Sequence, residues 1–155
     1  MKILYFDCAM GAAGDMLMAA LLELPPAQED FLARLNAALA GKAVVSASPD
    51  VRRGICGTHV SVVIDGEEEG DAHGGRHRHT CVKELLSLID GIPADEKARA
   101  DARAVYSLIA DAESRVHGAP MENIHFHELG SLDALADVVG GCMLINELAA
   151  GLIAA

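Results

Sequence analysis

The chain has 155 residues, of which 52% are hydrophobic, so it can bury a sizeable core and is too apolar to be disordered throughout. Aromatic residues make up only 3% and tryptophan is absent, so the core is expected to consist of Leu, Val, Ile, Ala and Met. The formal net charge of −11 argues against binding to nucleic acids or to anionic membrane surfaces, and favours cations as partners.

The cysteines and the N-terminal segment indicate the compartment. The four cysteines are widely separated without a C-x-x-C pair, which argues against a zinc ribbon and a disulfide framework and favours a reducing environment. MKILYFD meets an acid too early for a signal peptide, and no run approaches the ~18 apolar residues of a membrane span. We therefore expect a cytoplasmic protein that does not enter a membrane.

The N-terminal quarter predicts one strand and two helices. A short, mostly buried strand is expected over residues 2–7, followed by a glycine-rich turn. Asp15 is expected to be the N-cap of a first helix, which Pro25-Pro26 ends. A second helix is expected from about Gln28 to Ala40, with Gly41 as its C-terminal stop.

The middle of the chain predicts a hairpin and a loop. Residues 43–48 and 57–65 have the composition of strands, joined as an antiparallel hairpin with a longer loop around Arg52-Arg53-Gly54. Residues 66–80 are polar and rich in histidine, and we expect them to form a flexible loop.

The C-terminal half predicts three helices. A short one is expected over residues 82–90, ending at Gly91, and a long one from Pro93 to Gly118. Its apolar stripe comprises Ala98, Ala102, Val105, Ile109, Ala112 and Val116. From Ser131 a helix that is apolar nearly all round is expected to run to the end of the chain.

These elements predict an α/β or α+β fold, with a small mixed sheet of about three to four strands packed by about five helices. We expect residues 1–155 to form a single domain. The apolar end GLIAA would normally be covered by other protein, so we expect a longer native polypeptide or a second one.

The segment NIHFHELGSLDALADVV, residues 123–139, contains the densest group of candidate site residues. His125 and His127 would lie on one side of a strand, where two imidazoles can converge on a metal ion, while Phe126 points into the core. Glu128 could add an oxygen ligand or orient a histidine. Asp133 and Asp137 share a helix face, where a buried acid pair requires a positive partner. A structural interpretation stays open, because acids are also favoured near a helix start.

A second candidate is the turn FDCAMGAAGDM. Gly11 and Gly14 precede a helix whose exposed N–H groups can hold phosphate, although no established phosphate-loop motif is present. Asp7 and Asp15 would repel a bare phosphate and suit one that arrives with a divalent ion. The alternative is that the glycines form only a tight turn.

The third candidate is the sequence DAHGGRHRH with His73, His77 and His79. Histidine-rich loops bind nickel, zinc and copper, so capture or storage of a metal is one interpretation, and a solvated loop with incidental affinity is the other.

Taken together, these motifs resemble the LarC family of nickel insertion proteins. The resemblance lies in YFDCAMGAAGDMLMAALLEL, in the histidine-rich loop ending in HRH, and in AESRVHGAPMENIHFHELGSLDALADVVG. It covers essentially the whole chain. Family members usually continue for more than twice this length, so the chain resembles their N-terminal portion.

The resemblance implies an activity. These proteins are nickel insertases of the lyase class, which insert nickel into pyridinium-3,5-bisthiocarboxylic acid mononucleotide and so form the nickel-pincer nucleotide of lactate racemase-type enzymes. The reaction depends on CTP with manganese or magnesium, bound by a C-terminal portion that is the implied partner. A homo-oligomer is expected, and activity of these residues alone is expected to be incomplete. Alternative functions are a non-enzymatic nickel metallochaperone, a metal-dependent phosphoester hydrolase and a scaffold for the CTP-binding portion.

Overall fold

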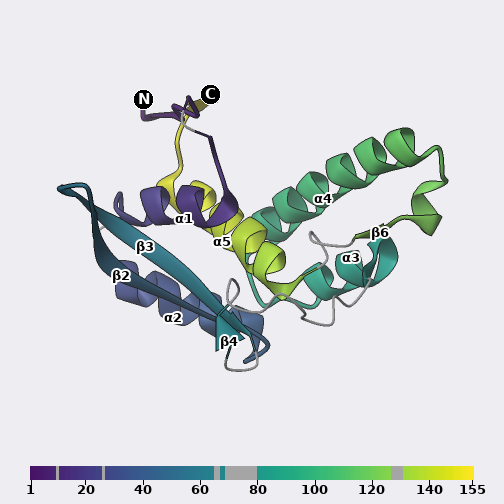
Figure 1. Ribbon diagram of the computed structural model, residues 1–155, viewed down its shortest axis with the longest axis horizontal. Helices are drawn as coiled ribbons and strands as arrows, with labels where there is room; N and C mark the ends of the chain where they lie inside the picture. The colour runs from purple at the N-terminus through teal and green to yellow at the C-terminus, as the bar shows by residue number, and fades with distance from the viewer. Residues whose placement is uncertain (10, 26, 65–66, 69–79, 127–130) are drawn as a thin grey trace.

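The computed structural model of the protein describes residues 1–9, 11–25, 27–64, 67–68, 80–126 and 131–155 (Figure 1). Of residues 67, 68, 80 and 125 it describes the backbone only. The elements in these ranges are β1 Ile3–Tyr5, α1 Gly14–Leu22, α2 Gln28–Leu39, β2 Val44–Arg52, β3 Ile55–Ile64, β4 Glu67–Glu68, β5 Thr80–Cys81, α3 Val82–Asp90, α4 Glu96–His117, the 3₁₀ turn Met121–Asn123, β6 His125–Phe126, α5 Leu132–Leu148 and β7 Leu152–Ala154. This mixture of helices and short strands confirms the expected fold class.

Helix α5 lies at the centre of the molecule. It packs against α1 on one side and against α4 on the other, and also touches β3 (Figure 1). Its buried positions lie on several sides, as the apolar sequence predicts: Leu135, Ala136, Val139, Gly140, Cys142, Met143 and Leu144. The hydroxyl of Ser131 accepts a hydrogen bond of 3.2 Å from the Ala134 N–H and caps the helix. None of the described helices combines the length and apolar character needed to cross a lipid bilayer.

The strands are divided among three small sheets. β1 pairs with β7 in parallel, β2, β3 and β4 form an antiparallel sheet, and β5 pairs with β6 antiparallel. The second sheet lies over α1 and α2, where Val45, Val60 and Val62 are buried. In β3 the buried Val60 and Val62 alternate with the less buried His59, Ser61 and Val63, as expected for a strand with one face on the core.

The predicted strand over residues 2–7 is shorter and far less buried than expected. In β1, Ile3 is 60% exposed and Tyr5 67% exposed. Its partner β7 occupies residues that were expected to continue the last helix. That prediction is wrong because α5 ends at Leu148, where Ala149 adopts a left-handed conformation with φ of 47°. The Lys2 ammonium donates to the Leu148 carbonyl at 2.8 Å, which satisfies an acceptor at the helix end.

The hairpin β2–β3 has a two-residue turn instead of the longer loop expected. Arg53 and Gly54 both have positive φ, 53° and 81°, as a type I′ turn requires. Pairing therefore continues up to Arg52 and Ile55. Within the predicted loop over residues 66–80, Glu67–Glu68 forms β4 and Thr80 begins β5. Residues 69–79 lie outside the described residues.

Two helix starts differ from prediction, and one helix end agrees with it. α1 begins at Gly14 with Ala13 as N-cap, so Asp15 lies in its first turn and is not the cap. α4 begins after Asp95, whose carboxylate accepts from the Ala98 N–H at 2.8 Å, and not at Pro93. α2 ends as expected, but Ala40 as well as Gly41 adopts a left-handed conformation. In each case a local capping arrangement decided the boundary.

The buried face of α4 also differs from the predicted stripe. Ala98, Ala102, Tyr106 and Ala110 are buried, at strict i, i+4 spacing. Val116 is 80% exposed and Ala112 is exposed as well. The prediction of buried residues was therefore wrong at the C-terminal end of α4, because this end of the helix extends beyond the elements that cover its earlier turns.

We predict opposite effects for alanine at two neighbouring glycines of α5. A Cβ at Gly140 would lie 2.7 Å from Met18 Sδ and 3.1 Å from Leu35 Cδ2, whereas one at Gly141 would meet nothing within 4 Å. Gly140→Ala should lower the free energy of unfolding by about 1–3 kcal/mol through overpacking. Gly141→Ala should raise it by about 0.5–1 kcal/mol through helix propensity. Urea denaturation measures both, and equal effects would contradict close packing at Gly140.

Candidate functional site

The two acids of the predicted constellation lie one turn apart on α5. Asp133 is in the first turn of the helix and Asp137 in the second, and both are partly buried. The structure brings this face of α5 toward α1 and α4. Both acids are therefore close enough to α4 to affect Tyr106, and Asp137 also reaches the start of α1.

Asp137 lies directly against the N-terminus of α1. A Cβ added at Gly14 would be only 2.5 Å from Asp137 Oδ2 and 2.6 Å from Asp137 Cβ, so only glycine fits this position. The N-cap Ala13 offers no side-chain acceptor to the first turn. The carboxylate thus lies beside the start of α1, the end of a helix near which acidic side chains are favoured. Two constellations far apart in the sequence, the glycine turn and the acid helix, meet here.

Tyr106 on α4 belongs to the same cluster, and the sequence analysis missed it. Its side chain is fully buried, and within the described ranges its hydroxyl has no hydrogen-bond partner. Burial raises the pKa of the Tyr106 hydroxyl, and the charges of Asp137 and then Asp133 raise it further. The phenol is therefore neutral and faces a negative field. Its burial could have been inferred from the sequence, because Tyr106 follows Ala98 and Ala102 at intervals of four residues on the same helix face.

The strand β6 connects the histidine motif to this cluster. Cys81 pairs with His125 and Thr80 with Phe126, so the backbone at His125 is extended as predicted. Phe126 is 2% exposed and its ring lies 5.9 Å from that of Tyr106 at an angle of 57°. The expectation that Phe126 enters the core is confirmed. The predicted residues His127 and Glu128 lie outside the described residues, and so do His73, His77 and His79.

The remaining predicted residues are in the turn before α1. Asp7 is exposed, and its Oδ1 accepts a hydrogen bond of 3.1 Å from the Ala9 N–H. Gly11 has φ of 92°, which requires glycine, and its N–H donates to the Cys8 carbonyl at 3.0 Å. Asp15 is partly buried in the first helical turn. No described contact joins Asp7 or Gly11 to the acid pair, so of this turn only Gly14 is shown to reach it.

The described side chains do not by themselves form a complete metal centre. Among them, no three His, Cys, Asp or Glu side chains gather closely enough to hold an ion. Burial raises the pKa of the Cys142 thiol to about 11, so this cysteine is protonated near neutral pH and is a poor metal ligand. Asp133 and Asp137 supply carboxylate oxygens, and a metal held there needs further ligands from neighbouring residues.

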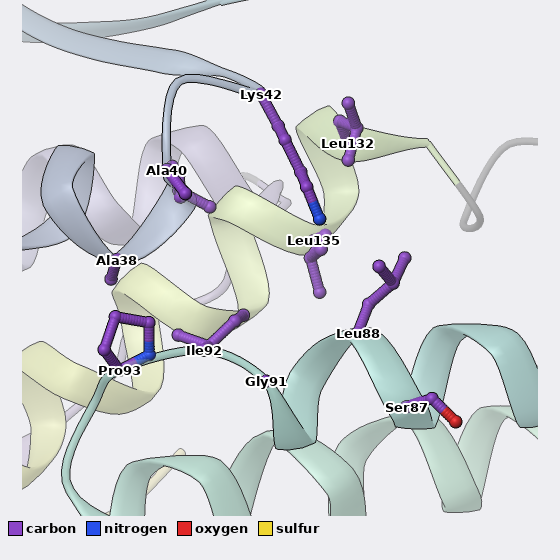
Figure 2. A pocket seen from close by; sticks show the side chains of 11 residues that line it. Ala38, Ala40, Lys42, Ser87, Leu88, Gly91, Ile92, Pro93, Leu132 and Leu135 are labelled. Atoms are coloured by element: carbon purple, nitrogen blue, oxygen red, sulfur yellow. The ribbon is translucent and has the colours of Figure 1, made fainter.

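A groove of about 290 Å³ lies elsewhere, between the end of α2, the α3–α4 turn and the start of α5 (Figure 2). Its lining is mostly apolar, with Leu88, Ile92 and Leu135 around the Lys42 side chain. At 3.6 residues per turn, the mean direction of Leu132 and Leu135 around the α5 axis is about 150° from that of Asp133 and Asp137. The groove is therefore not part of the candidate site.

Comparison with known proteins gives a consistent result. Residues 4–155 match the family model described as "Nickel insertion protein". The chain is 32% identical over 149 residues to the pyridinium-3,5-bisthiocarboxylic acid mononucleotide nickel insertion protein of Geobacillus kaustophilus, and 34% identical over 151 residues to the protein of that name from Acetivibrio thermocellus. Each alignment covers 96% of this chain but 36% of the relative, so the chain spans about a third of these proteins. No solved structure matches.

We predict that Gly14 and Asp137 are coupled in stability. Gly14→Ala should lower the free energy of unfolding by about 1–3 kcal/mol, because its Cβ would overlap Asp137. Asp137→Gly should relieve part of that loss, and the double-mutant cycle should give a coupling of about 0.5–3 kcal/mol. Alanine at position 137 would not relieve the clash, because the Asp137 Cβ itself lies 2.6 Å from a Cβ added at Gly14. The substitution at 137 is therefore to glycine.

The control cycle combines Gly14→Ala with Asp133→Gly, because none of the three atoms nearest a Cβ at Gly14 belongs to Asp133. Urea denaturation should show smaller coupling in this second cycle. Additive effects at positions 14 and 137 would contradict the close approach of α1 and α5.

Proposed function

The chain belongs to the nickel insertion protein family, and from this we propose that it provides the nickel-handling part of the insertion of nickel into pyridinium-3,5-bisthiocarboxylic acid mononucleotide. The substrate is taken from the names of the relatives from Geobacillus kaustophilus and Staphylococcus epidermidis. The single observation that supports this role is the position of Asp137. Its carboxylate lies at the start of α1 and beside α4, in a partly buried cluster next to the strand that carries His125.

The chemistry of insertion defines what such a site must do. Water must be removed from Ni²⁺, the ion must be presented to two thiocarboxylates, and the proton lost from the metallated ring carbon must be accepted. Carboxylate oxygens and imidazole nitrogens suit nickel, and a carboxylate can also take the proton. A site that combines both groups in a partly buried position meets these requirements.

We assign roles to the residues accordingly. His125 and His127 hold the incoming nickel, and Glu128 orients one of the two imidazoles. Asp133 or Asp137 completes the ligand set or accepts the proton. The surroundings of Tyr106 support this assignment. Its ring packs against Phe126 of β6, the strand that begins at His125, and its hydroxyl is affected by the charges of Asp137 and Asp133.

The glycine turn is proposed to bind the phosphate of the mononucleotide. Gly11 and Gly14 and the first N–H groups of α1 supply the donors, while Asp7 and Asp15 favour a phosphate accompanied by a divalent ion. The position of Asp137 beside Gly14 supports the need for a divalent ion, because the Asp137 carboxylate lies at the helix start in addition to Asp15.

The wider reaction requires components beyond residues 1–155. We propose that CTP, with manganese or magnesium, is used by the C-terminal portion of the family proteins. The chain would then be an incomplete insertase of the lyase class that works with this portion, in the cytoplasm and as a homo-oligomer. The nickel-pincer nucleotide would pass to a lactate racemase-type enzyme. The alignments support this division, because about two thirds of each relative lies outside the aligned region.

We predict that the paired substitution His125→Ala/His127→Ala removes nickel binding from the site. In a background in which residues 73–79 are deleted, the affinity should fall by more than about a hundredfold, since losing a group that merely orients a ligand costs about ten- to a hundredfold. Isothermal titration calorimetry with Ni²⁺ measures this loss.

The matched control for this experiment is His59→Ala/His117→Ala. His59 is exposed on β3, and the His117 ring pairs with Glu113 at 3.1 Å on the surface of α4, so neither belongs to the cluster. Their removal should leave nickel binding unchanged. Equal affinities of the two double variants would remove the ligand assignment.

We also predict that deletion of residues 73–79 lowers the number of nickel ions bound but leaves insertion largely intact when nickel is plentiful. His73, His77 and His79 are proposed to capture nickel and not to take part in the reaction. The assay measures nickel-pincer nucleotide formed with CTP and Mn²⁺ after addition of the C-terminal portion of a relative. Loss of insertion at saturating nickel would contradict a storage role, and insertion without the added portion would contradict the proposed division.

A further inference from the structure

The hydroxyl of Tyr106 is a buried polar atom that the roles above do not use. The residue is 0% exposed, and within the described part of the chain its oxygen has no hydrogen-bond partner. Buried hydroxyl groups almost always have a partner, because losing hydration without replacing it is unfavourable. Phenylalanine would fill the same space without this disadvantage. The hydroxyl therefore calls for an explanation other than packing.

The position of Tyr106 indicates what that explanation is. α4 packs along α5, and the hydroxyl lies within the electrostatic reach of both Asp137 and Asp133. The ring also packs against Phe126, whose strand contains His125. The Tyr106 side chain is therefore near both the helix that carries the acid pair and the strand that begins the histidine motif.

We propose that Tyr106 is a positioning residue for the divalent cation, and that its hydroxyl donates a hydrogen bond to a water ligand of the ion held by Asp133 and Asp137. This inference rests on the proposed function of the acid pair. A neutral phenol can donate one proton, and a partly hydrated Ni²⁺ brings oxygen atoms into the cluster. The hydroxyl gains its partner when the ion enters, so its hydrogen bond favours the loaded state over the empty one.

This arrangement predicts an unusual combination of effects on stability and on nickel affinity when Tyr106 is replaced by phenylalanine. In most buried positions, loss of a hydroxyl that is hydrogen-bonded within the protein lowers stability. Here the metal-free chain should be unaffected or become more stable, while its affinity for nickel falls. A purely structural tyrosine cannot produce both changes together.

The experiment compares Tyr106→Phe with Tyr5→Phe in the full chain, with His73, His77 and His79 replaced by alanine throughout. Tyr5 is the only other tyrosine and is 67% exposed on β1, so it is a matched control. In Tyr106→Phe the Tm of the metal-free chain should stay level or rise by about 2–4 °C. Its affinity for Ni²⁺ by calorimetry should fall by about ten- to a hundredfold. Tyr5→Phe should change neither value.

A lower Tm in Tyr106→Phe, or unchanged affinity for Ni²⁺, would overturn the proposal. Asp133→Asn/Asp137→Asn separates this failure from failure of the site itself. If the acid variant loses nickel binding and Tyr106→Phe does not, only the role of Tyr106 is refuted. If neither variant loses nickel binding, the acid pair is not the site and the proposal fails with it.

Fluorescence provides a second readout that a packing role would not change. The chain has no tryptophan and only two tyrosines, so in Tyr5→Phe the emission comes from Tyr106. Addition of Ni²⁺ should change this emission and saturate with the dissociation constant found by calorimetry. The absence of any saturable change would place the ion away from Tyr106 and refute the proposal.

Discussion

The close packing of α1 against α5 is the interaction on which both the core and the candidate site depend. It relies on two positions without side chains. At Gly140 the Met18 and Leu35 side chains occupy the space of a Cβ, and at Gly14 the Asp137 carboxylate does so. The first contact closes the apolar core, and the second holds an acid at the start of α1. The same helix pair therefore stabilises the fold and orients a chemical group.

The cluster around Asp137 brings two carboxylates and a buried phenol together on packed helices. Two partly buried carboxylates on one helix face repel each other, and a fully buried phenol lies in their field. The N-terminus of α1 offsets part of this charge by its dipole. A bound cation would offset much more, because it would neutralise the carboxylates directly.

The residues of the candidate site lie within the part of the relatives that this chain matches. The chain spans about a third of their length, yet the helices α1, α4 and α5 already assemble the acid pair, Gly14 and Tyr106. Several apolar side chains of β1 and β7, among them Ile3, Tyr5 and Leu152, are exposed and are not part of the core.

The sequence by itself determined the helices with strong apolar periodicity, the antiparallel hairpin, and the acids and histidines of residues 123–139, because local patterns and residue chemistry encode these features. Two predictions from the sequence were wrong: Asp15 is not the cap of α1, and the last helix does not continue into β7. Helix capping and strand pairing depend on residues that are distant in the sequence or on local backbone geometry, which the sequence pattern does not show. Only the tertiary structure decided that Gly14 meets Asp137 and that Tyr106 faces the acids. These contacts join residues about 120 and 30 positions apart, and packing of α1 and α4 on α5 alone brings them together.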